Sequence, residues 1–204
     1  FAALLGDRLG RIHAETARRP DLAPTFATDD NFHALRLEPY LGETARNHPD
    51  LADRLAAVVE TTRSTKRALV HGDVSPKNIL MGPDGPVLLD AECAWWGDPA
   101  FDLAFGLNHL LLKAVHLPAA RAALFASFEA MATAHLARVD FEPAAALDGR
   151  AAALLAALLL ARIDGKSPVE YLTDAERDLV RTAARALLAR PPATLAEVAA
   201  QIER

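Results

Sequence analysis

The chain has 204 residues, a formal net charge of −5 and one cysteine, and 51% of its residues are hydrophobic. This length and balance favour one globular domain with a full core, and the negative charge excludes a basic surface for nucleic acid or an anionic membrane. The lone Cys93 excludes an internal disulfide and favours a reducing, cytoplasmic compartment. Alanine and leucine dominate and long alternating strands are absent, so we expect a mainly α (α+β) fold.

Residues 1–18 predict an amphipathic helix, because Leu4, Leu5, Leu9 and Ile12 fall on one helical face. His13 on this helix could approach a ligand. A lone histidine is more often held by packing or solvent, and we favour that interpretation.

Residues 19–48 contain Pro20, Pro24 and Pro39 and predict a loop or short-element insertion, not a regular helix. Substrate-specific groups often lie on such loops, so Arg36 and Tyr40 are candidates for substrate binding. The alternative, which we favour, is that the arginine pairs with a nearby acid and the tyrosine packs against other side chains.

Asp50 is expected to cap a helix that runs to about Thr65. Three short apolar runs follow, at residues 68–70, 79–81 and 87–89, each bounded by turn residues. The proline and glycine residues between the last two runs predict a hairpin.

The polar residues at the ends of these runs form a set suited to phosphoryl transfer. Asp73 can orient an attacking hydroxyl group and accept its proton. Asn78 and Asp90, which the hairpin brings together, supply the hard oxygen ligands that Mg²⁺ prefers while it also binds the phosphates of ATP. Charge neutralisation by the metal is the main help that such a transition state needs.

The neighbouring polar residues have more open roles. We expect His71 to hold the loop by hydrogen bonds. Lys77 either neutralises the transferred phosphate or is a solvated loop lysine. Glu92 either contacts a second Mg²⁺ or hydrogen-bonds the loop.

After Glu92, residues 94–97 predict a turn, and Trp95 and Trp96 either wall the site or pack in the core. Asp98 is expected to cap a helix that extends to roughly His116. Residues 118–139 and 143–163 predict two long helices. The apolar run at residues 151–161 is too short, and too soon followed by charged residues, to cross a bilayer.

The order of these motifs resembles the aminoglycoside phosphotransferase and choline-kinase-like family, within the protein-kinase-like superfold. The resemblance rests on residues 71–73, Asn78, the pair Asp90 and Glu92, and the continuation at residues 97–99 and 102–104. It implies that residues 1–204 are the large C-terminal lobe. It also implies that a buried Asp102 braces the catalytic loop, with Asp98 as further structural support.

The family's small β-rich lobe carries a phosphate-covering loop and a strand-borne lysine, and neither is found in this chain. We therefore expect the N-terminal lobe to be absent from the chain and the isolated piece to be inactive. The resemblance implies an ATP- and Mg²⁺-dependent kinase that acts on a hydroxyl group of a small molecule. A non-catalytic, pseudokinase-like binding or scaffold module and a nucleotidyl transferase on the same fold remain as alternatives, and the acceptor and oligomeric state stay open.

Overall fold

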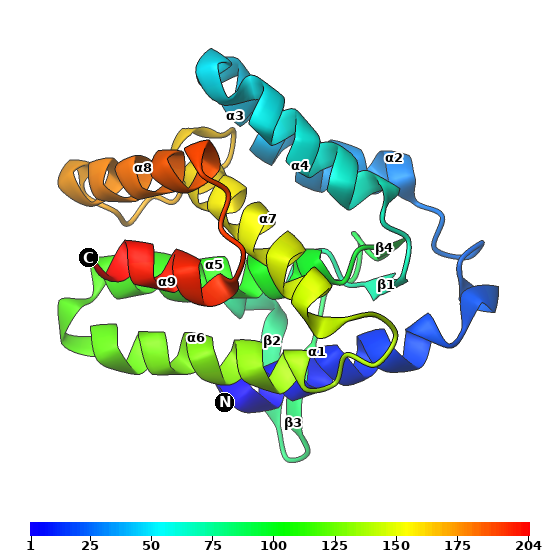
Figure 1. Ribbon diagram of the computed structural model, residues 1–204. Coiled ribbons are helices and arrows are strands. Elements are labelled where there is room, and N and C mark those ends of the chain that lie inside the picture. The colour runs from blue at the N-terminus through cyan, green and yellow to red at the C-terminus, as the bar shows by residue number, and fades with distance from the viewer.

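The computed structural model describes residues 1–204 and shows a helical body with two small antiparallel sheets, which confirms the predicted mainly α (α+β) class (Figure 1). The helices are α1 (Ala2–Ala17), η1 (Pro20–Leu22), α2 (Asp29–Phe32), η2 (His33–Gly42), α3 (Glu43–Asn47), η3 (Pro49–Leu51), α4 (Ala52–Ser64), η4 (Pro76–Asn78), α5 (Ala100–His116), η5 (Pro118–Ala120), α6 (Arg121–Leu136), α7 (Ala144–Asp164), α8 (Asp174–Ala189) and α9 (Leu195–Glu203). The strands are β1 (Ala68–Val70), β2 (Ile79–Gly82), β3 (Gly85–Leu88) and β4 (Trp95–Gly97).

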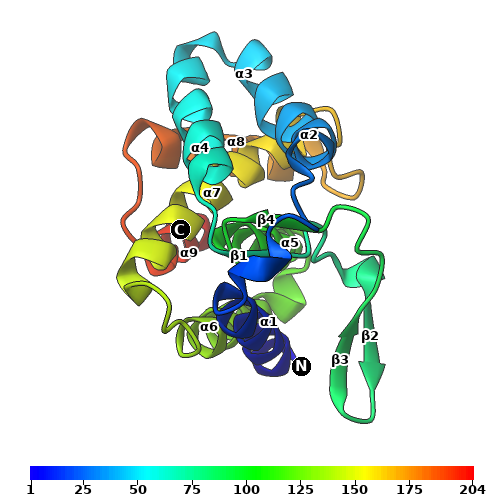
Figure 2. The same cartoon turned by 90° about the vertical axis from the view of Figure 1, so that its right-hand side faces the viewer.

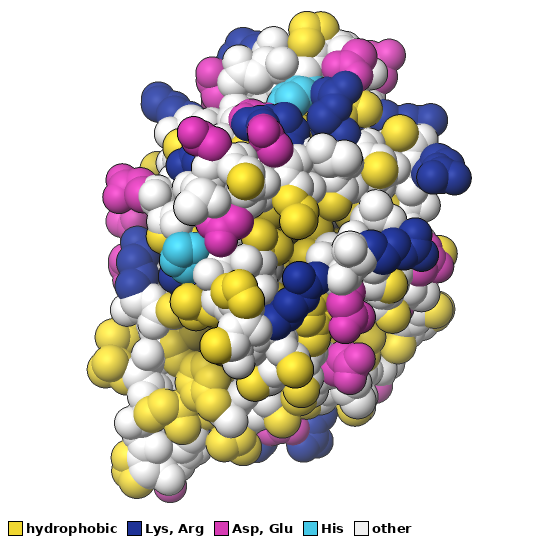
Figure 3. Space-filling model, turned by 90° about the vertical axis from the view of Figure 1, so that its left-hand side faces the viewer, with side chains coloured by type: hydrophobic (Ala, Val, Ile, Leu, Met, Phe, Trp, Pro, Cys, Tyr) yellow, Lys and Arg dark blue, Asp and Glu magenta, His cyan; other side chains and the backbone are white.

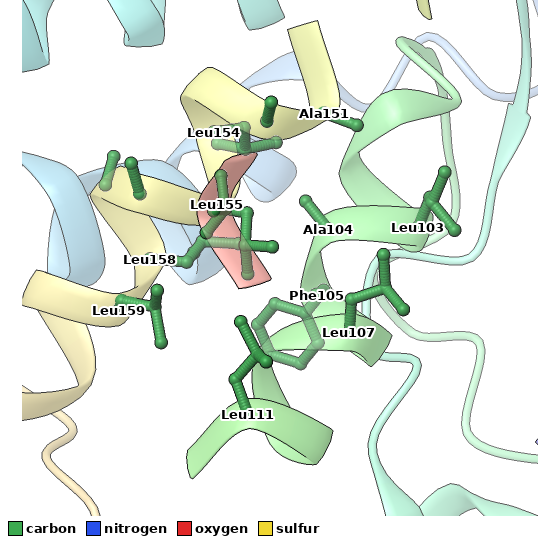
Figure 4. Close-up of a cluster of buried hydrophobic side chains, with 14 of the residues drawn as sticks. Leu103, Ala104, Phe105, Leu107, Leu111, Ala151, Leu154, Leu155, Leu158 and Leu159 are labelled. Atoms are coloured by element: carbon green, nitrogen blue, oxygen red, sulfur yellow. The ribbon is translucent and has the colours of Figure 1, made fainter. Parts of the chain in front are cut away.

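The core lies between α5 and α7, whose apolar side chains face one another (Figure 4). Leu107 and Leu111 of α5 and Leu155 and Leu158 of α7 are fully buried there. Helix α6 packs against α5 and α1, and α8 and α9 cover α7. Burial of leucine side chains contributes about 1.5–3 kcal/mol each, so the contact between α5 and α7 contributes strongly to stability.

Helix α7 is longer than the apolar run found in the sequence, and by length and composition it could span a membrane. In this fold, however, 61% of its most apolar window is buried against other helices. A second candidate arises only if α5 and the helix after it are joined across a 120° bend. The burial of α7 identifies it as the central core helix of this structure.

The buried face of α1 differs from the prediction. Leu4 is 53% exposed, whereas the face through Leu5, Leu9 and His13 is buried. The reason is the close approach of α6: a Cβ atom at Gly6 would lie 2.2 Å from the Met131 carbonyl oxygen. Glycine therefore sets which face of α1 meets its neighbour, and a count of apolar residues does not reveal this.

Residues 19–48, expected to be a loop or an insertion of short elements, are helical for much of their length. Helices α2, η2 and α3 follow one another without a break from Asp29 to Asn47, and η2 has π-helical geometry. Pro39 lies inside η2, where the wider π turn accommodates a residue that lacks an N–H group. Its carbonyl oxygen accepts a hydrogen bond from the Lys166 N–H, 2.9 Å away, which ties this segment to the end of α7.

The hairpin prediction is confirmed: β2 and β3 pair antiparallel, with Leu80 opposite Val87, and project from the helical body (Figure 2). Residues 95–97, expected to be a turn, instead form β4, which pairs antiparallel with β1. The partner strand lies far away along the chain, so local turn signals did not indicate this pairing.

Asp50 does not cap the following helix. It lies in η3, and its carboxylate pairs with Arg185 of α8 at 2.6 Å. Pro49 begins the helical turn instead, as proline is suited to do.

Candidate functional site

The loop after β1 carries His71, Gly72 and Asp73 and is bent tightly at Gly72. This glycine has φ +82°, and a Cβ atom there would lie 2.7 Å from the Cys93 carbonyl oxygen. Only glycine adopts this conformation in this space without strain. The bend leaves the Asp73 carboxylate 8% exposed, at the edge of the core.

The Asp102 carboxylate, in the first turn of α5, holds this loop in place. It is 1% exposed and accepts hydrogen bonds from the backbone N–H groups of His71 at 2.7 Å and Gly72 at 2.8 Å. Hydrogen bonds to a buried carboxylate are charge-assisted and strong. The position of the loop therefore depends on the position of α5.

Two buried histidines continue the hydrogen-bonded chain from Asp102. His13 Nε2 lies 3.1 Å from the carboxylate, and His13 Nδ1 lies 2.9 Å from Nε2 of His135 in α6. Burial acts to raise the Asp102 pKa, but the hydrogen bond and charge of His13 and the two loop N–H groups outweigh it, so the pKa lies below its usual value. Burial, with the charge of His13, lowers the pKa of His135 to about 3, so this ring is neutral at pH 7.

Two cationic side chains approach the Asp73 carboxylate. Arg36 Nη2 lies 3.0 Å from Oδ2, and Lys77 Nζ lies 3.5 Å from the same oxygen. Arg36 also donates from Nε to the Gly72 carbonyl oxygen at 2.5 Å and is itself buried. Arg36 thus pairs with a nearby acid, as we expected from the sequence.

Tyr40, the other substrate candidate of this segment, packs in the core. It is 8% exposed, and its ring lies 5.8 Å from that of Phe105 in an edge-to-face arrangement. The structure therefore gives Tyr40 a packing role.

Hydrogen bonds of Asn78 and His71 link the catalytic loop to the end of the hairpin. Asn78 Nδ2 donates to the Asp73 carbonyl oxygen at 3.2 Å, and the Leu89 N–H donates to the Asn78 carbonyl oxygen at 2.8 Å. His71 accepts from the Asp73 N–H at Nδ1, 3.2 Å away, and its Nε2 lies 3.0 Å from the Leu89 carbonyl oxygen. A ring that accepts at Nδ1 and donates at Nε2 is neutral.

The donor set at this junction suits Mg²⁺. The Asn78 amide nitrogen is committed to the loop, so its oxygen is the atom left for a cation. Asp90 follows directly after Leu89 and has φ +61°, a left-handed conformation that aspartate tolerates better than most residues and that often occurs at functional sites. One amide oxygen and one carboxylate fit a metal that keeps phosphates and water in its shell.

Glu92 does not join these residues in a carboxylate cluster. No three His, Cys, Asp or Glu side chains of the chain converge where they could hold a metal ion. The Glu92 side chain is exposed, and its carbonyl oxygen accepts a hydrogen bond from Asn31 Nδ2 at 3.0 Å.

The two tryptophans of β4 separate into different environments. Trp95 is fully buried, stacks on Phe32 with 4.1 Å between ring centroids, and donates from Nε1 to Asp29 at 3.0 Å. It therefore belongs to the core. Trp96 is half-buried at the sheet edge, and its backbone N–H donates to the Phe26 carbonyl oxygen.

Asp98 supports the start of α5 and links it to α7. Its Oδ1 accepts from the Ala100 N–H at 3.0 Å, and both carboxylate oxygens pair with Arg150 of α7 at 2.9 and 3.0 Å. Arg150 also pairs with Glu142. A cavity of about 440 Å³ between α4 and α7 is lined by Asp98 and Arg150, but none of Asp73, Asn78 and Asp90 reaches it.

Two positioning residues were not found from the sequence. His13 was expected to be held by packing or solvent, and it is buried, but its contact with Asp102 was not predicted. His135 had no signal, because only packing of α6 on α1 brings the two histidines together.

Comparison with known proteins points to the same region. The profile of the phosphotransferase enzyme family matches residues 1–115. Over 83 residues the chain is 31% identical to the methylthioribose kinase of Erwinia tasmaniensis, a stretch covering 41% of this chain and 21% of that protein. Over 37 residues it is 49% identical to a Klebsiella pneumoniae protein named probable ketoamine kinase, covering 18% of this chain and 29% of that protein. The matched stretches thus span less than a third of either curated relative.

Proposed function

Because this chain belongs to the phosphotransferase enzyme family, we propose that it supplies the catalytic lobe of a kinase that moves the γ-phosphoryl group of ATP to a hydroxyl group of a small molecule, with Mg²⁺ as cofactor. The matched family region covers α1, the catalytic loop, the hairpin and most of α5. The remaining helices bury this region and complete the fold.

The observation that carries this proposal is the junction of Asp73, Asn78 and Asp90. The Asn78 side chain is bonded to the Asp73 carbonyl oxygen, and its backbone carbonyl oxygen is bonded to Leu89, the residue before Asp90. The candidate base and one candidate metal ligand, Asn78, therefore belong to one hydrogen-bonded unit, and the second candidate ligand, Asp90, is the next residue after it along the chain. Phosphoryl transfer depends mainly on such positioning and on charge neutralisation.

Asp73 is the group placed to orient the acceptor hydroxyl and receive its proton. Arg36 holds one carboxylate oxygen, Oδ2, so the orientation of the carboxylate is set before an acceptor binds. Lys77 is 71% exposed and approaches the same oxygen at 3.5 Å, so its ammonium group is free to turn toward a transferred phosphate.

Asn78 and Asp90 would hold Mg²⁺ through their side-chain oxygens. A metal ion held by these two residues would supply positive charge that neutralises the charge developing during transfer. The neutral His71 ring keeps the two halves of the site together by joining the catalytic loop to Leu89.

We also propose that a second lobe closes over the nucleotide. Support comes from the hairpin, where Leu80, Met81, Val87 and Leu89 are 40–56% exposed. Hydrophobic side chains gather at the lower left of the face shown in Figure 3. Contiguous apolar surface of this kind marks an interaction site.

The test is replacement of Asp73 by asparagine in the complete natural polypeptide. We expect loss of phosphoryl transfer of about 10²–10⁴-fold, the range for a positioned acid or base. Asp53→Asn, an exposed change on α4, is the matched control and should leave turnover unchanged. Retention of more than a tenth of the activity by the Asp73 variant would contradict the assignment of the base.

The nature of the transferred group is tested separately. ATP labelled at the γ-phosphate should label the acceptor, whereas ATP labelled at the α-phosphate should not. Label from the α-phosphate would identify nucleotidyl transfer instead.

A further inference from the structure

One face of α5 extends from the catalytic loop and carries two polar side chains. Phe105, His109 and Lys113 are spaced four residues apart and therefore lie on one side of the helix, about 6 Å apart along its axis. The Arg36 guanidinium, which pairs with Asp73, lies 6.0 Å from the centroid of the Phe105 ring, and the His109 ring lies 5.5 Å from that ring. His109 and Lys113 are thus the next groups beyond the candidate base.

Two residues from other elements border this face. Lys113 Nζ lies 3.5 Å from the ring centroid of Tyr171, in the connection between α7 and α8. Arg162, near the end of α7, lies 5.9 Å from the Tyr40 ring, which itself contacts Phe105. In Figure 2 the connection between α7 and α8 lies on the same side of the molecule as the catalytic loop.

This cluster, made of His109, Lys113, Arg162 and Tyr171, holds polar atoms that the fold leaves without partners. His109 Nε2, Arg162 Nε and the Tyr171 hydroxyl are buried and make no hydrogen bond within the protein. Each such atom costs about 1–3 kcal/mol unless something binds it. Three in one cluster leave hydrogen-bonding capacity that bound water or a polar ligand can fill.

The charge of the cluster indicates which ligand fits. Lys113 and Arg162 form no ion pair with a carboxylate, and Arg162 Nη1 donates to the Ser167 carbonyl oxygen. Burial, with the charges of Arg162, Lys113 and Lys77, lowers the pKa of His109 to about 4 despite the opposing charge of Asp73. At pH 7 the cluster therefore has two positive charges, a neutral imidazole and a phenol.

We propose that this cluster binds the far end of the acceptor, and that the acceptor is a hydroxylated small molecule carrying an anionic group such as a carboxylate. The anionic group pairs with Lys113 and Arg162, while His109 and Tyr171 bond to its hydroxyl groups. A polycationic acceptor such as an aminoglycoside is repelled. This inference rests on the proposed function, since it assumes that Asp73 faces the reacting hydroxyl group.

Equilibrium binding tests which class of small molecule this cluster binds, and it does not require turnover. The probes are D-gluconate and D-glucuronate, which carry a carboxylate, sorbitol, which carries hydroxyl groups alone, and kanamycin, a polycation. Ligand-observed NMR on the full chain at low salt measures their affinities. We expect the carboxylates to bind about tenfold more tightly than sorbitol, equivalent to ~1.4 kcal/mol, and kanamycin to bind least.

Substitutions in the cluster test whether the probe molecules bind there. Lys113→Gln should weaken gluconate about tenfold and leave sorbitol unchanged, because it removes charge alone. Arg162→Gln is the second variant, and Lys166→Gln, an exposed charge change in the adjacent connection, is the control that should change neither affinity. Unchanged gluconate affinity in both cluster variants, absence of carboxylate binding, or stronger binding of kanamycin overturns the inference. Failure of the Asp73→Asn test bears on the proposed function alone, since these affinities need no transfer.

Discussion

Replacing Asp102 by asparagine tests whether this buried carboxylate holds the catalytic loop. The native side chain accepts hydrogen bonds from the backbone N–H groups of His71 and Gly72 and from His13. Asparagine has nearly the same shape but only one acceptor oxygen. Its amide group would point a donor at one of the two backbone donors.

The magnitude follows from those contacts. Loss of one hydrogen bond to a charged group costs about 1.5–3 kcal/mol, and a buried N–H group left without a partner costs about 1–3 kcal/mol. Because the side chain is 1% exposed, water does not replace the lost acceptor. We expect the free energy of unfolding to fall by roughly 3–5 kcal/mol.

Urea denaturation followed by tryptophan fluorescence measures this change. With a denaturant slope of roughly 2 kcal/mol per molar, the midpoint should fall by about 2 M. Backbone N–H exchange should quicken at His71 and Gly72. Asp50→Asn, which removes the charge from a more exposed ion pair, should change stability by less than ~1 kcal/mol. A change of under about 1 kcal/mol at Asp102, with unchanged exchange at the loop, would refute the bracing role.

Three further outcomes are expected. The pKa values of His135 and His109 fall from 6.5 to about 3 and about 4 on folding. The unfolded chain therefore binds more protons below pH 6.5, and denaturation midpoints should fall as pH drops toward 4, with up to about 1.4 kcal/mol per pH unit from each ring. Gly72→Ala forces a side chain onto φ +82° and should cost about 1–3 kcal/mol together with most phosphoryl transfer, measured by denaturation and turnover. Arg150→Leu leaves two buried carboxylates unpaired and should cost about 3–5 kcal/mol in urea denaturation, whereas Arg18→Leu, at an exposed pair, should cost under ~1 kcal/mol.

The sequence by itself determined the parts that depend on neighbouring residues. The strand, loop and hairpin over residues 68–89 were predictable because their apolar runs are short and proline and glycine mark the turns. The positions of Asp73, Asn78 and Asp90 at the ends of these runs could also be read directly from the sequence. The long helices also followed, since an apolar repeat persists over many residues.

Only the tertiary structure decided which distant residues meet at the site. The contact of Arg36 with Asp73 depends on η2, which was not predicted because Pro39 lies within it. The buried contacts of His13 with Asp102 and His135 depend on packing of α1 against α5 and α6. Such contacts come from side-chain volume and close approach between helices, and no local spacing in the chain encodes them.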